Sequence, residues 1–282
     1  MKTVSNRKLR VLFGGGLVLF LAMACTNPSS SESTVASATP TTVAVTGISL
    51  DITTAKVGST YTRQLNATIL PDTATNKSVS WTSSKSSVAT VTSAGLVTGV
   101  AAGSATITVT SSDGGYTASC TITEGDYVVG DFGPAGGYVF YDAGASSTYG
   151  WRYLECAPRD QETGVQWYNG TAINISTGFA IGTGKANTTA IVAAQGTGKY
   201  AASVCKNLSL GGFRDWFLPS EYELDLMYTK LKAANLGYLA SVIYWSSTQY
   251  DTNNANAEYF DGNGKTNGPK RATVYVRAIR SF

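Results

Sequence analysis

The sequence predicts two folded domains, an all-β sandwich followed by an α+β domain. In the first half, short runs of β-branched residues recur between Gly, Pro, Asp and Asn, at the spacing typical of a sandwich. The second half combines aromatic-rich strands with one strongly specified helix, which begins after Pro219. About 240 residues remain once the N-terminal signal and tether described below are set aside, which is enough for two domains.

The helix after Pro219 has a local reason for its start and for its buried face. Pro219 favours an extended Leu218, so no helix begins earlier. Ser220 is a good N-cap, and Glu223 completes a Ser-x-x-Glu capping box. An apolar face then follows at helical spacing, formed by Leu224, Met227, Tyr228 and Leu231.

The N-terminus predicts export. Residues 1–10 are basic without an acid, and residues 11–24 are apolar or glycine, which indicates a secretory signal too short to span a membrane. The ending at Leu21-Ala-Met-Ala-Cys25 resembles the lipobox of bacterial lipoproteins. This resemblance implies a signal peptide over 1–25 and a lipidated Cys25, although ordinary cleavage after Ala24 is the alternative. Residues 26–43 have the composition of a disordered tether.

The composition narrows the classes of function. The formal charge of +3 is small, so no broad basic surface for nucleic acid is predicted. The chain has no histidine, which excludes Ser-His-Asp and Cys-His catalysis and a His-based zinc site. We expect no metal, no cofactor and no nucleic-acid partner. A calcium site at Asp251, Glu258 and Asp261 is a weaker alternative, because these acids lack the spacing of a calcium loop.

Residues 44–124 carry the motifs of a known domain family. The carriers are Val45–Leu50, Leu70–Asn76, Val79–Ser84, Val88–Val91 and Gly95–Ile107. In this order they resemble the bacterial immunoglobulin-like group 2 domain, which implies an immunoglobulin-like sandwich. Such domains usually act as spacers. Trp81 alternates in phase with Val79 and is therefore expected in the core.

Residues 127–282 resemble a second family, the Lcl C-terminal domain of a collagen-like adhesin. The carriers are Gly133–Tyr141, Gly150–Glu155, Gly182–Asn187, Asp215–Ser220, Tyr244–Ser247 and Val276–Arg280. The resemblance implies an exported α+β domain, and the domain of the family's namesake is implicated in attachment to sulfated glycans. The last segments also resemble the C-type-lectin-like group at the level of fold, which says little about a ligand.

The remaining elements of this second domain follow from local patterns. Strands are expected at Tyr138–Tyr141, Gly150–Pro158 and Ala272–Arg280, and the aromatic segment Tyr244–Tyr250 lies between the helix after Pro219 and the last loop. Asn187 or Thr188 caps a short helix that runs through Gln195, and Tyr200–Leu208 forms another helix. Asp251–Arg271 is polar and rich in asparagine, so it is expected to be a long solvated loop.

Recognition is expected from aromatic rings and polar side chains around this loop. The candidate ligand-binding residues are Arg214, Asp215, Trp245, Tyr250, Asn253, Asn254, Asn256, Tyr259, Lys265, Lys270 and Arg271. For Trp245 a place in the core is the stronger interpretation. Arg214 and Asp215 are alternatively a buried ion pair that fixes the turn before the helix.

The cysteines leave one question open. Cys156 and Cys205 fall in the same domain, and in an exported protein they either form a disulfide or stay as two thiols. Cys120 lies in a strand of the first domain and is expected to be a small core residue.

Together these observations predict a lipid-anchored protein of the cell envelope, at the outer membrane or cell surface. Its C-terminal domain would bind a glycan or a matrix or host polymer, and the membrane would be contacted through the lipid alone. A structural envelope protein that self-associates into a homo-oligomer is one alternative. A carboxylate-pair glycosidase is another, with the available acids being Glu155, Asp160, Glu162, Glu221 and Glu223.

Overall fold

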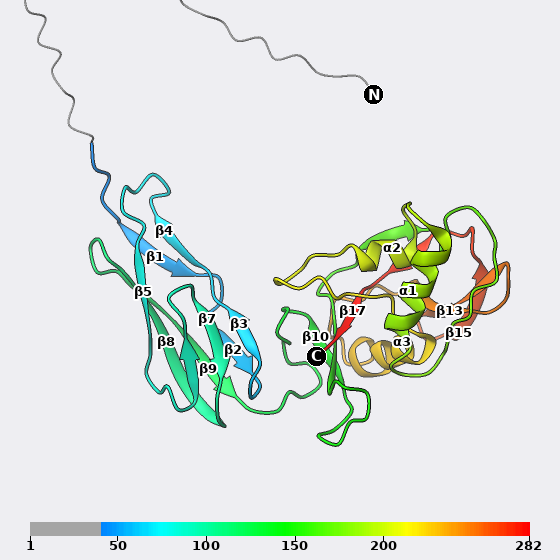
Figure 1. Cartoon of the computed structure of the whole chain (residues 1–282), viewed down its shortest axis with the longest axis horizontal. Helices are drawn as coiled ribbons and strands as arrows, with labels where there is room; N and C mark the ends of the chain where they lie inside the picture. Colours follow the sequence, from blue (N-terminus) through cyan, green and yellow to red (C-terminus); the bar gives the residue numbers. More distant parts are fainter. Residues whose placement is uncertain (1–40) are drawn as a thin grey trace, which may run out of the picture. The chain divides into compact units, whose positions relative to one another are not determined.

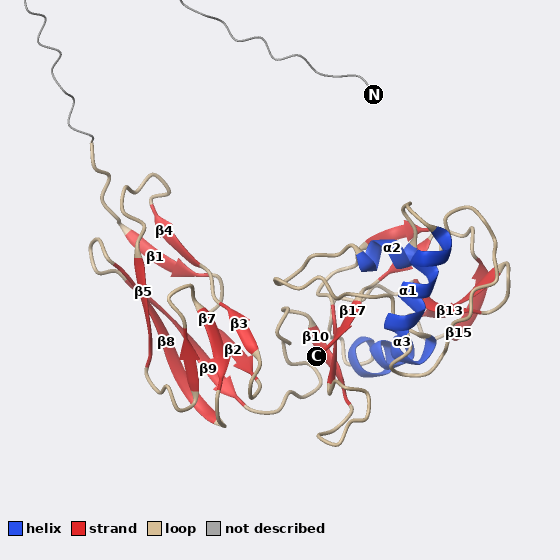
Figure 2. Cartoon of the chain, in the orientation of Figure 1, coloured by secondary structure: helices blue, strands red, loops and turns tan. Residues whose placement is uncertain are grey.

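The computed structural model describes residues 41–282 (Figure 1). The predicted signal peptide, Cys25 and almost all of the tether lie outside the described residues. Residues Thr42–Phe282 form one compact unit, in which a β-only region precedes a mixed α/β region along the chain (Figure 2). In this part of the chain no helix is both long and apolar enough to cross a membrane.

The first domain is built of nine strands. They are Gly47–Leu50 (β1), Thr54–Val57 (β2), Thr62–Gln64 (β3), Ala67–Leu70 (β4), Val79–Ser83 (β5), Ala89–Val91 (β6), Leu96–Gly99 (β7), Gly103–Ser111 (β8) and Thr117–Glu124 (β9). A four-stranded sheet has the order β2-β9-β8-β5, a second sheet has the order β3-β7-β6, and β1 pairs with β4. The strand pattern of the sequence therefore forms a sandwich, as predicted.

The core of this domain follows from strand alternation. In β8 every second residue is buried, and Ile107 and Val109 are fully covered. Cys120 and Ile122 on β9 join the same apolar cluster, and Trp81 packs against it. The core positions expected for Trp81 and Cys120 are thus confirmed.

The second domain contains two sheets. Its strands are Tyr138–Asp142 (β10), Tyr153–Cys156 (β11), Glu162–Val165 (β12), Ile243–Gln249 (β13), Asn254–Tyr259 (β14), Gly264–Pro269 (β15), Val274–Val276 (β16) and Ile279–Ser281 (β17). The smaller sheet has the order β10-β11-β17 and the larger one the order β12-β16-β13-β14-β15. The last two strands of the chain therefore serve different sheets.

Three α-helices and one π-helical turn complete this domain. They are Gly184–Gln195 (α1), Ala201–Lys206 (α2), Glu221–Met227 (α3) and the π-turn Tyr228–Lys232 (η1). One buried cluster joins α1 and α2 to the larger sheet around Trp167, Trp216 and Trp245. A second cluster packs Leu224 and Met227 of α3 with Phe140, Leu154 and Tyr244.

The capping box at Ser220 is confirmed, and its glutamate does more than the sequence indicates. Glu223 is fully buried and accepts hydrogen bonds from the N–H of Ser220 at 2.7 Å and of Gly182 at 2.8 Å. One carboxylate thereby serves the start of α3 and the residues just before α1. Helix α1 begins at Gly184, with Thr183 as its N-cap, and not at the predicted cap, Asn187 or Thr188. Asn187 instead bonds the backbone of Gly178 through both ends of its amide.

Two other predicted elements differ from the structure. Asp251–Arg271 is largely a hairpin, because β14 and β15 pair in register from Asn254↔Pro269 to Tyr259↔Gly264. The expected strand Ala272–Arg280 is split into β16 and β17. The break falls at Arg277, whose buried guanidinium bonds Asp160 and the carbonyls of Ala157, Gly237 and Tyr238.

Candidate functional site

An open hollow of about 450 Å³ lies at the end of the β14–β15 hairpin, and we name it the hairpin hollow. Its lining residues are Tyr168, Ala172, Asn253, Asn254, Pro269 and Arg271. Three segments contribute: the loop after β12, the turn before β14 and the end of β15. The hollow therefore gathers an aromatic ring, two amides and a guanidinium at one place on the surface.

The turn before β14 is held by Asp251. Its carboxylate accepts the backbone N–H groups of Asn253 and Asn254, each at 2.7 Å, and the side-chain amide of Asn254 at 2.9 Å. The amide bond from Asn254, followed by the backbone bond from Asn253, keeps the pKa of Asp251 below its usual value. Asp251 thus fixes the turn as an anion, and Asn253 remains exposed at the rim.

The buried side chain of Lys270 holds this end of the hairpin in place. The residue is 1% exposed, and its Nζ donates to the carbonyls of Ile173 and Thr252 and to Oε1 of Gln249, at 3.1, 2.8 and 2.6 Å. It also lies 4.7 Å from the centre of the Trp167 ring. Desolvation lowers its pKa to about 8. Lys270 therefore positions three loops, and its ammonium is bonded inside the protein, whereas the sequence predicted it as a ligand contact.

Arg271, the next residue, has the opposite environment. Its side chain is exposed and lines the hollow, while its backbone carbonyl accepts a bond from Nε2 of Gln166 at 3.1 Å. Tyr168 also lines the hollow and is partly buried. A guanidinium and an aromatic ring on one rim can bind an anionic group and the apolar face of a sugar.

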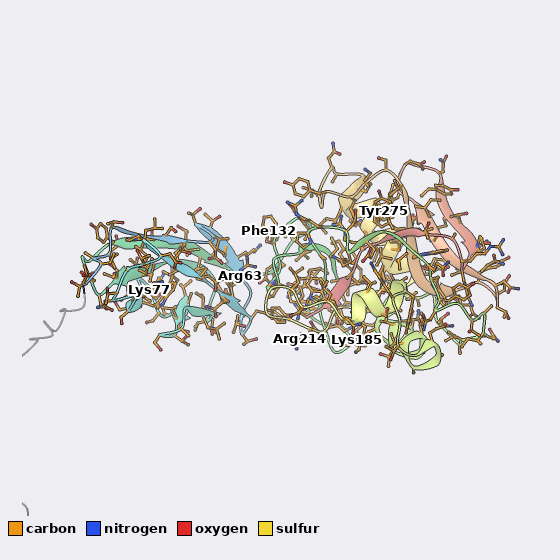
Figure 3. All side chains as sticks on the ribbon, turned by 90° about the horizontal axis from the view of Figure 1, so that it is seen from above. Arg63, Lys77, Phe132, Lys185, Arg214 and Tyr275 are labelled. Atoms are coloured by element: carbon orange, nitrogen blue, oxygen red, sulfur yellow. The ribbon has the colours of Figure 1, made fainter. Side chains whose placement is uncertain are left out.

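The structure distributes the other predicted site residues over several places. Trp245 is 1% exposed and donates its indole N–H to the carbonyl of Val165, so it belongs to the core, as the stronger interpretation holds. Arg214 is exposed on a different loop (Figure 3). Asp215 pairs with Arg280 at 2.9 Å, so the alternative of an Arg214–Asp215 ion pair is wrong.

The remaining predicted residues lie along the hairpin and outside the hollow. Asn256 donates to the Glu221 carboxylate, and Lys265 lies 3.5 Å from Asp225. Tyr259 is half-buried, and Tyr250 is 63% exposed. Of the eleven predicted residues, the hollow brings together Asn253, Asn254 and Arg271. Tyr168 and Ala172 were missed, because no local pattern connects them to a hairpin that begins more than eighty residues later.

The acidic residues considered for hydrolysis each have a structural partner. Glu155 pairs with Arg280, Asp160 with Arg277 and Glu162 with Lys199, each at 2.7 Å. Glu221 binds the amide of Asn256, and Glu223 has the capping role described above. Within residues 41–282, no group of three or more Cys, Asp and Glu side chains is arranged to hold a metal ion. The carboxylates therefore give no support to a hydrolase.

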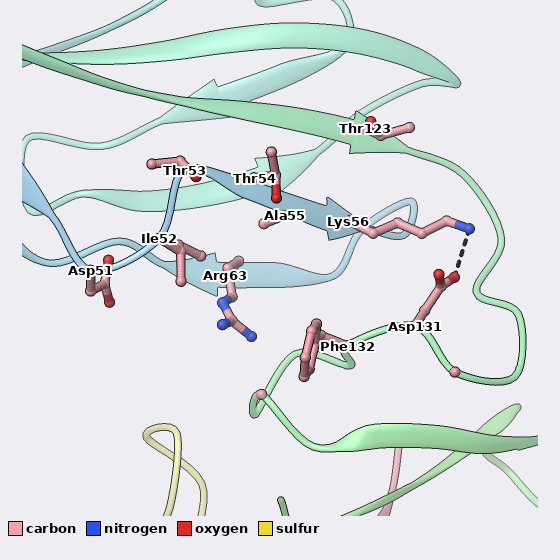
Figure 4. A pocket seen from close by; sticks show the side chains of 12 residues that line it. Asp51, Ile52, Thr53, Thr54, Ala55, Lys56, Arg63, Thr123, Asp131 and Phe132 are labelled. Atoms are coloured by element: carbon pink, nitrogen blue, oxygen red, sulfur yellow. Dashed lines mark hydrogen bonds and ion pairs between the residues drawn. The ribbon is translucent and has the colours of Figure 1, made fainter. Parts of the chain in front are cut away.

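Another hollow of about 800 Å³ is lined by residues from the first domain and from the segment after β9 (Figure 4). Its charged groups are already paired. Lys56 binds Asp131 at 2.8 Å, and Arg63 donates to the carbonyls of Gly133 and Pro134 at 2.9 and 3.3 Å. These side chains hold the backbone in place, and so we do not assign a site here.

The cysteines of the described residues are free and buried. Cys156 belongs to the apolar cluster of α3 and Cys205 to that of α1 and α2. The disulfide between them is therefore not formed in the structure. Desolvation raises the pKa of Cys156 to about 11, and the pKa of Cys205 is raised further for the same reason.

Comparison with known families matches the two domains separately. Residues 44–122 match the bacterial Ig-like domain (group 2), and residues 157–280 match the Lcl C-terminal domain. Both family resemblances seen in the sequence are thereby confirmed.

Two curated relatives come from Bifidobacterium longum subsp. longum. An alpha-L-arabinofuranosidase is 47% identical over 79 residues, which is 27% of this chain and 7% of the enzyme. A 3-O-alpha-D-galactosyl-alpha-L-arabinofuranosidase is 44% identical over 85 residues, which is 30% of this chain and 7% of that enzyme. The chain thus spans a small fraction of the length of the curated relatives it matches.

Solved structures with some similarity include bacterial surface proteins. A fimbrial protein from Bacteroides ovatus has a TM-score of 0.43 and 10% identity, covering 85% of this chain and 71% of its own. An intimin mutant from EHEC O157:H7 has a TM-score of 0.25 and 17% identity, covering 80% and 87%. Domains 4 and 5 of the S-layer protein SbsC have a TM-score of 0.26 and 24% identity, covering 29% and 53%.

Proposed function

We propose that this chain, which carries a bacterial Ig-like domain of group 2 followed by an Lcl C-terminal domain, is an adhesin-like protein of the cell surface. The first domain acts as a spacer, and the second binds an anionic glycan or another polymer of the matrix or host. Binding uses side chains at the hairpin hollow, and no bond is made or broken. The family match and the sulfated-glycan attachment implied by the Lcl resemblance support this proposal.

One observation carries the proposal: a buried lysine holds an exposed arginine at an open hollow. Hydrogen bonds to three acceptors fix the side chain of Lys270. Its neighbour Arg271 is exposed and lines the hollow together with Asn253 and Tyr168. An arginine fixed at its backbone loses less entropy when its guanidinium binds a sulfate or carboxylate. This arrangement suits a polymer that is held at an open surface and not enclosed.

Anchoring through a lipidated Cys25 is part of the proposal. The basic and apolar segment before Cys25 supports it, and a disordered tether over 26–43 would place the folded domains away from the membrane. Metabolic labelling with an alkyne fatty acid tests it. Label on the wild-type protein and none on Cys25→Ser is expected, and equal labelling of both would contradict lipidation at this residue.

The proposal is tested by binding to immobilised heparin, a sulfated polysaccharide, with full-length protein. Arg271→Ala is expected to weaken binding about tenfold, because it removes a charge-assisted contact. Arg214→Ala is the matched control, since it removes the same charge from an exposed position outside the hollow.

Equal losses in the two variants would show binding by net charge alone and would refute a site at the hollow. No binding of the folded wild-type protein to heparin or to any other anionic polysaccharide on an array would refute the glycan assignment. The proposed alternative would then be a structural envelope protein that self-associates.

A further inference from the structure

A second hollow of the C-terminal domain, of about 840 Å³, lies beside α1, and we name it the aromatic hollow. Its lining includes Tyr149 and Trp151 before β11, Gly182, and Lys185 and Thr189 on α1. Lys185 is exposed on the helix (Figure 3). The aromatic hollow shares no lining residue with the hairpin hollow.

Two rings form one wall of the aromatic hollow. Tyr149 and Trp151 stack with centroids 4.7 Å apart and planes inclined by 14°. Tyr141 meets Trp151 edge-on at 6.3 Å and supports it from the neighbouring strand. Tyr149 nevertheless remains 44% exposed. An exposed ring in a hollow, fixed by a stacked partner, is a ready platform for an apolar ligand face.

The backbone also holds the Tyr149 ring in place. Ser147 donates its hydroxyl to the carbonyl of Trp151 and accepts the N–H of Tyr149, which closes the turn that carries both rings. Gly182 has a φ of +89°, and a Cβ there would lie 3.0 Å from Cδ1 of Tyr149 and 3.7 Å from Cζ2 of Trp151. A glycine at this point lets the chain approach the ring edge closely. The platform is therefore preorganised.

Helix α1 supplies the exposed polar groups of the aromatic hollow. Lys185 and Thr189 lie one helical turn apart on α1, so both face the same side. Glu223 also lines the hollow, but it is fully buried and its carboxylate accepts the N–H groups of Ser220 and Gly182. Ala186, Ala190 and Ala193 complete the helical wall with small side chains that leave room for a ring-sized group.

We infer that the aromatic hollow binds a pyranose ring of a neutral saccharide. The C–H face of the sugar would stack on Tyr149, and Lys185 would donate to its hydroxyl groups. The Thr189 hydroxyl, which donates to the carbonyl of Lys185 at 2.9 Å, would accept from them. A hollow lined by stacked aromatic rings and by the polar side chains of Lys185 and Thr189 fits a sugar, which has C–H faces and a hydroxyl edge. This inference does not rest on the hairpin hollow, which carries an unbalanced arginine.

The test titrates full-length protein with three neutral probes: cellohexaose, maltohexaose and mannohexaose. We expect at least one of them to bind, with chemical-shift changes at the Trp151 indole N–H and little dependence on salt. Tyr149→Ala should weaken this binding about tenfold, since it removes the stacking surface. Tyr149→Phe keeps the ring and should bind within about twofold of wild type. Tyr250→Ala, which removes an exposed ring outside the hollow, is the matched control.

Failure of all three neutral probes to bind the folded protein would overturn the inference. It would also be overturned if Tyr149→Phe lost as much affinity as Tyr149→Ala, or if Arg271→Ala abolished binding of the neutral probe. Heparin binding tests the proposed function alone: we expect Arg271→Ala to lose heparin binding and Tyr149→Ala to bind heparin as wild type does. The two assignments can thus fail separately.

Discussion

The hairpin hollow and the aromatic hollow belong to the same domain but are built in opposite ways. At the hairpin hollow, the buried Lys270 holds the surrounding loops in place and the exposed Arg271 faces solvent. The aromatic hollow is held by ring stacking between Tyr149 and Trp151 and by a close backbone approach at Gly182. The buried ammonium of Lys270 is stable only while its hydrogen bonds are made, whereas the stack of Tyr149 on Trp151 is stable as long as the rings fit closely.

This difference shows that adjacent residues of one type of charge can have unrelated roles. Lys270 and Arg271 are neighbours in sequence, yet Lys270 has its bonds inside the protein and Arg271 faces solvent. A variant that removes both would lose binding through unfolding as well as through lost contacts. The two positions must therefore be changed one at a time.

The largest effect is expected from Lys270→Met. Removal of the ammonium leaves the carbonyls of Ile173 and Thr252 without this donor in a buried place, and Oε1 of Gln249 keeps only the N–H of Ile175. We expect the free energy of unfolding to fall by about 3 kcal/mol. Urea unfolding measures this, with the exposed Lys230→Met as control. A change in the free energy of unfolding of less than about 0.5 kcal/mol would contradict the supporting role of Lys270.

The next effect concerns Glu258, which lies nearer the other end of the same hairpin. It is 2% exposed, and its Oε2 has no hydrogen-bond partner among residues 41–282. Desolvation, and then the nearby Asp225, raise its pKa from 4.5 to about 8. Between these two values the folded protein binds a proton that the unfolded chain releases, so the contribution of Glu258 to stability is fully present below the unfolded pKa and is lost as the pH rises to about 8.

Glu258→Gln removes this titration. At about 1.4 kcal/mol for each unit of pKa shift, the variant should be more stable than wild type at pH 8 by a few kcal/mol at most. Urea unfolding at pH 5 and pH 8 gives the comparison. The account of Glu258 is wrong if wild type and variant respond to pH in parallel.

Salt should affect ligand affinity differently at the two hollows. We expect the affinity for heparin at the hairpin hollow to fall several-fold between low and physiological ionic strength, because the contact is between charges near the surface. The affinity for a neutral hexasaccharide at the aromatic hollow should change by less than about twofold. Isothermal titration at two salt concentrations measures both, and equal salt dependence would remove the distinction.

The smallest effect is expected from Lys265→Ala. This lysine is partly exposed, 3.5 Å from Asp225 and 4.5 Å from the centre of the Tyr222 ring. Such a surface pair contributes about 0–1 kcal/mol. Heparin affinity should stay within about twofold of wild type. A tenfold loss of heparin affinity would indicate that the anion binds along the hairpin near Lys265 and not at the hairpin hollow.

Elements with local causes were predictable from the sequence. The capping box at Ser220 and the alternating strands of the first domain each arise within a few residues, and both are present in the structure. For Trp245 the core was the stronger of the two interpretations, and the residue is 1% exposed. Short-range patterns sufficed because neighbouring residues supply the stabilising contacts.

Features with distant partners were not predictable. The burial of Lys270 depends on Ile173, which is 97 residues away. The polar segment Asp251–Arg271 becomes a hairpin because β14 pairs with β13 of the larger sheet, although its asparagines favour loops. The break at Arg277 needs Asp160 and three carbonyls from other segments. The hairpin hollow was therefore predicted by three of its six lining residues, and the aromatic hollow was not predicted.

The most direct test of the proposed binding role is an NMR titration of isotope-labelled full-length protein with a sulfated heparin hexasaccharide. We expect the largest shift changes at Tyr168, Asn253 and Arg271, with saturation and with small changes around Arg214. That pattern would place an anionic glycan at the hairpin hollow. Changes centred on another surface of the domain, or none in the folded protein, would contradict it.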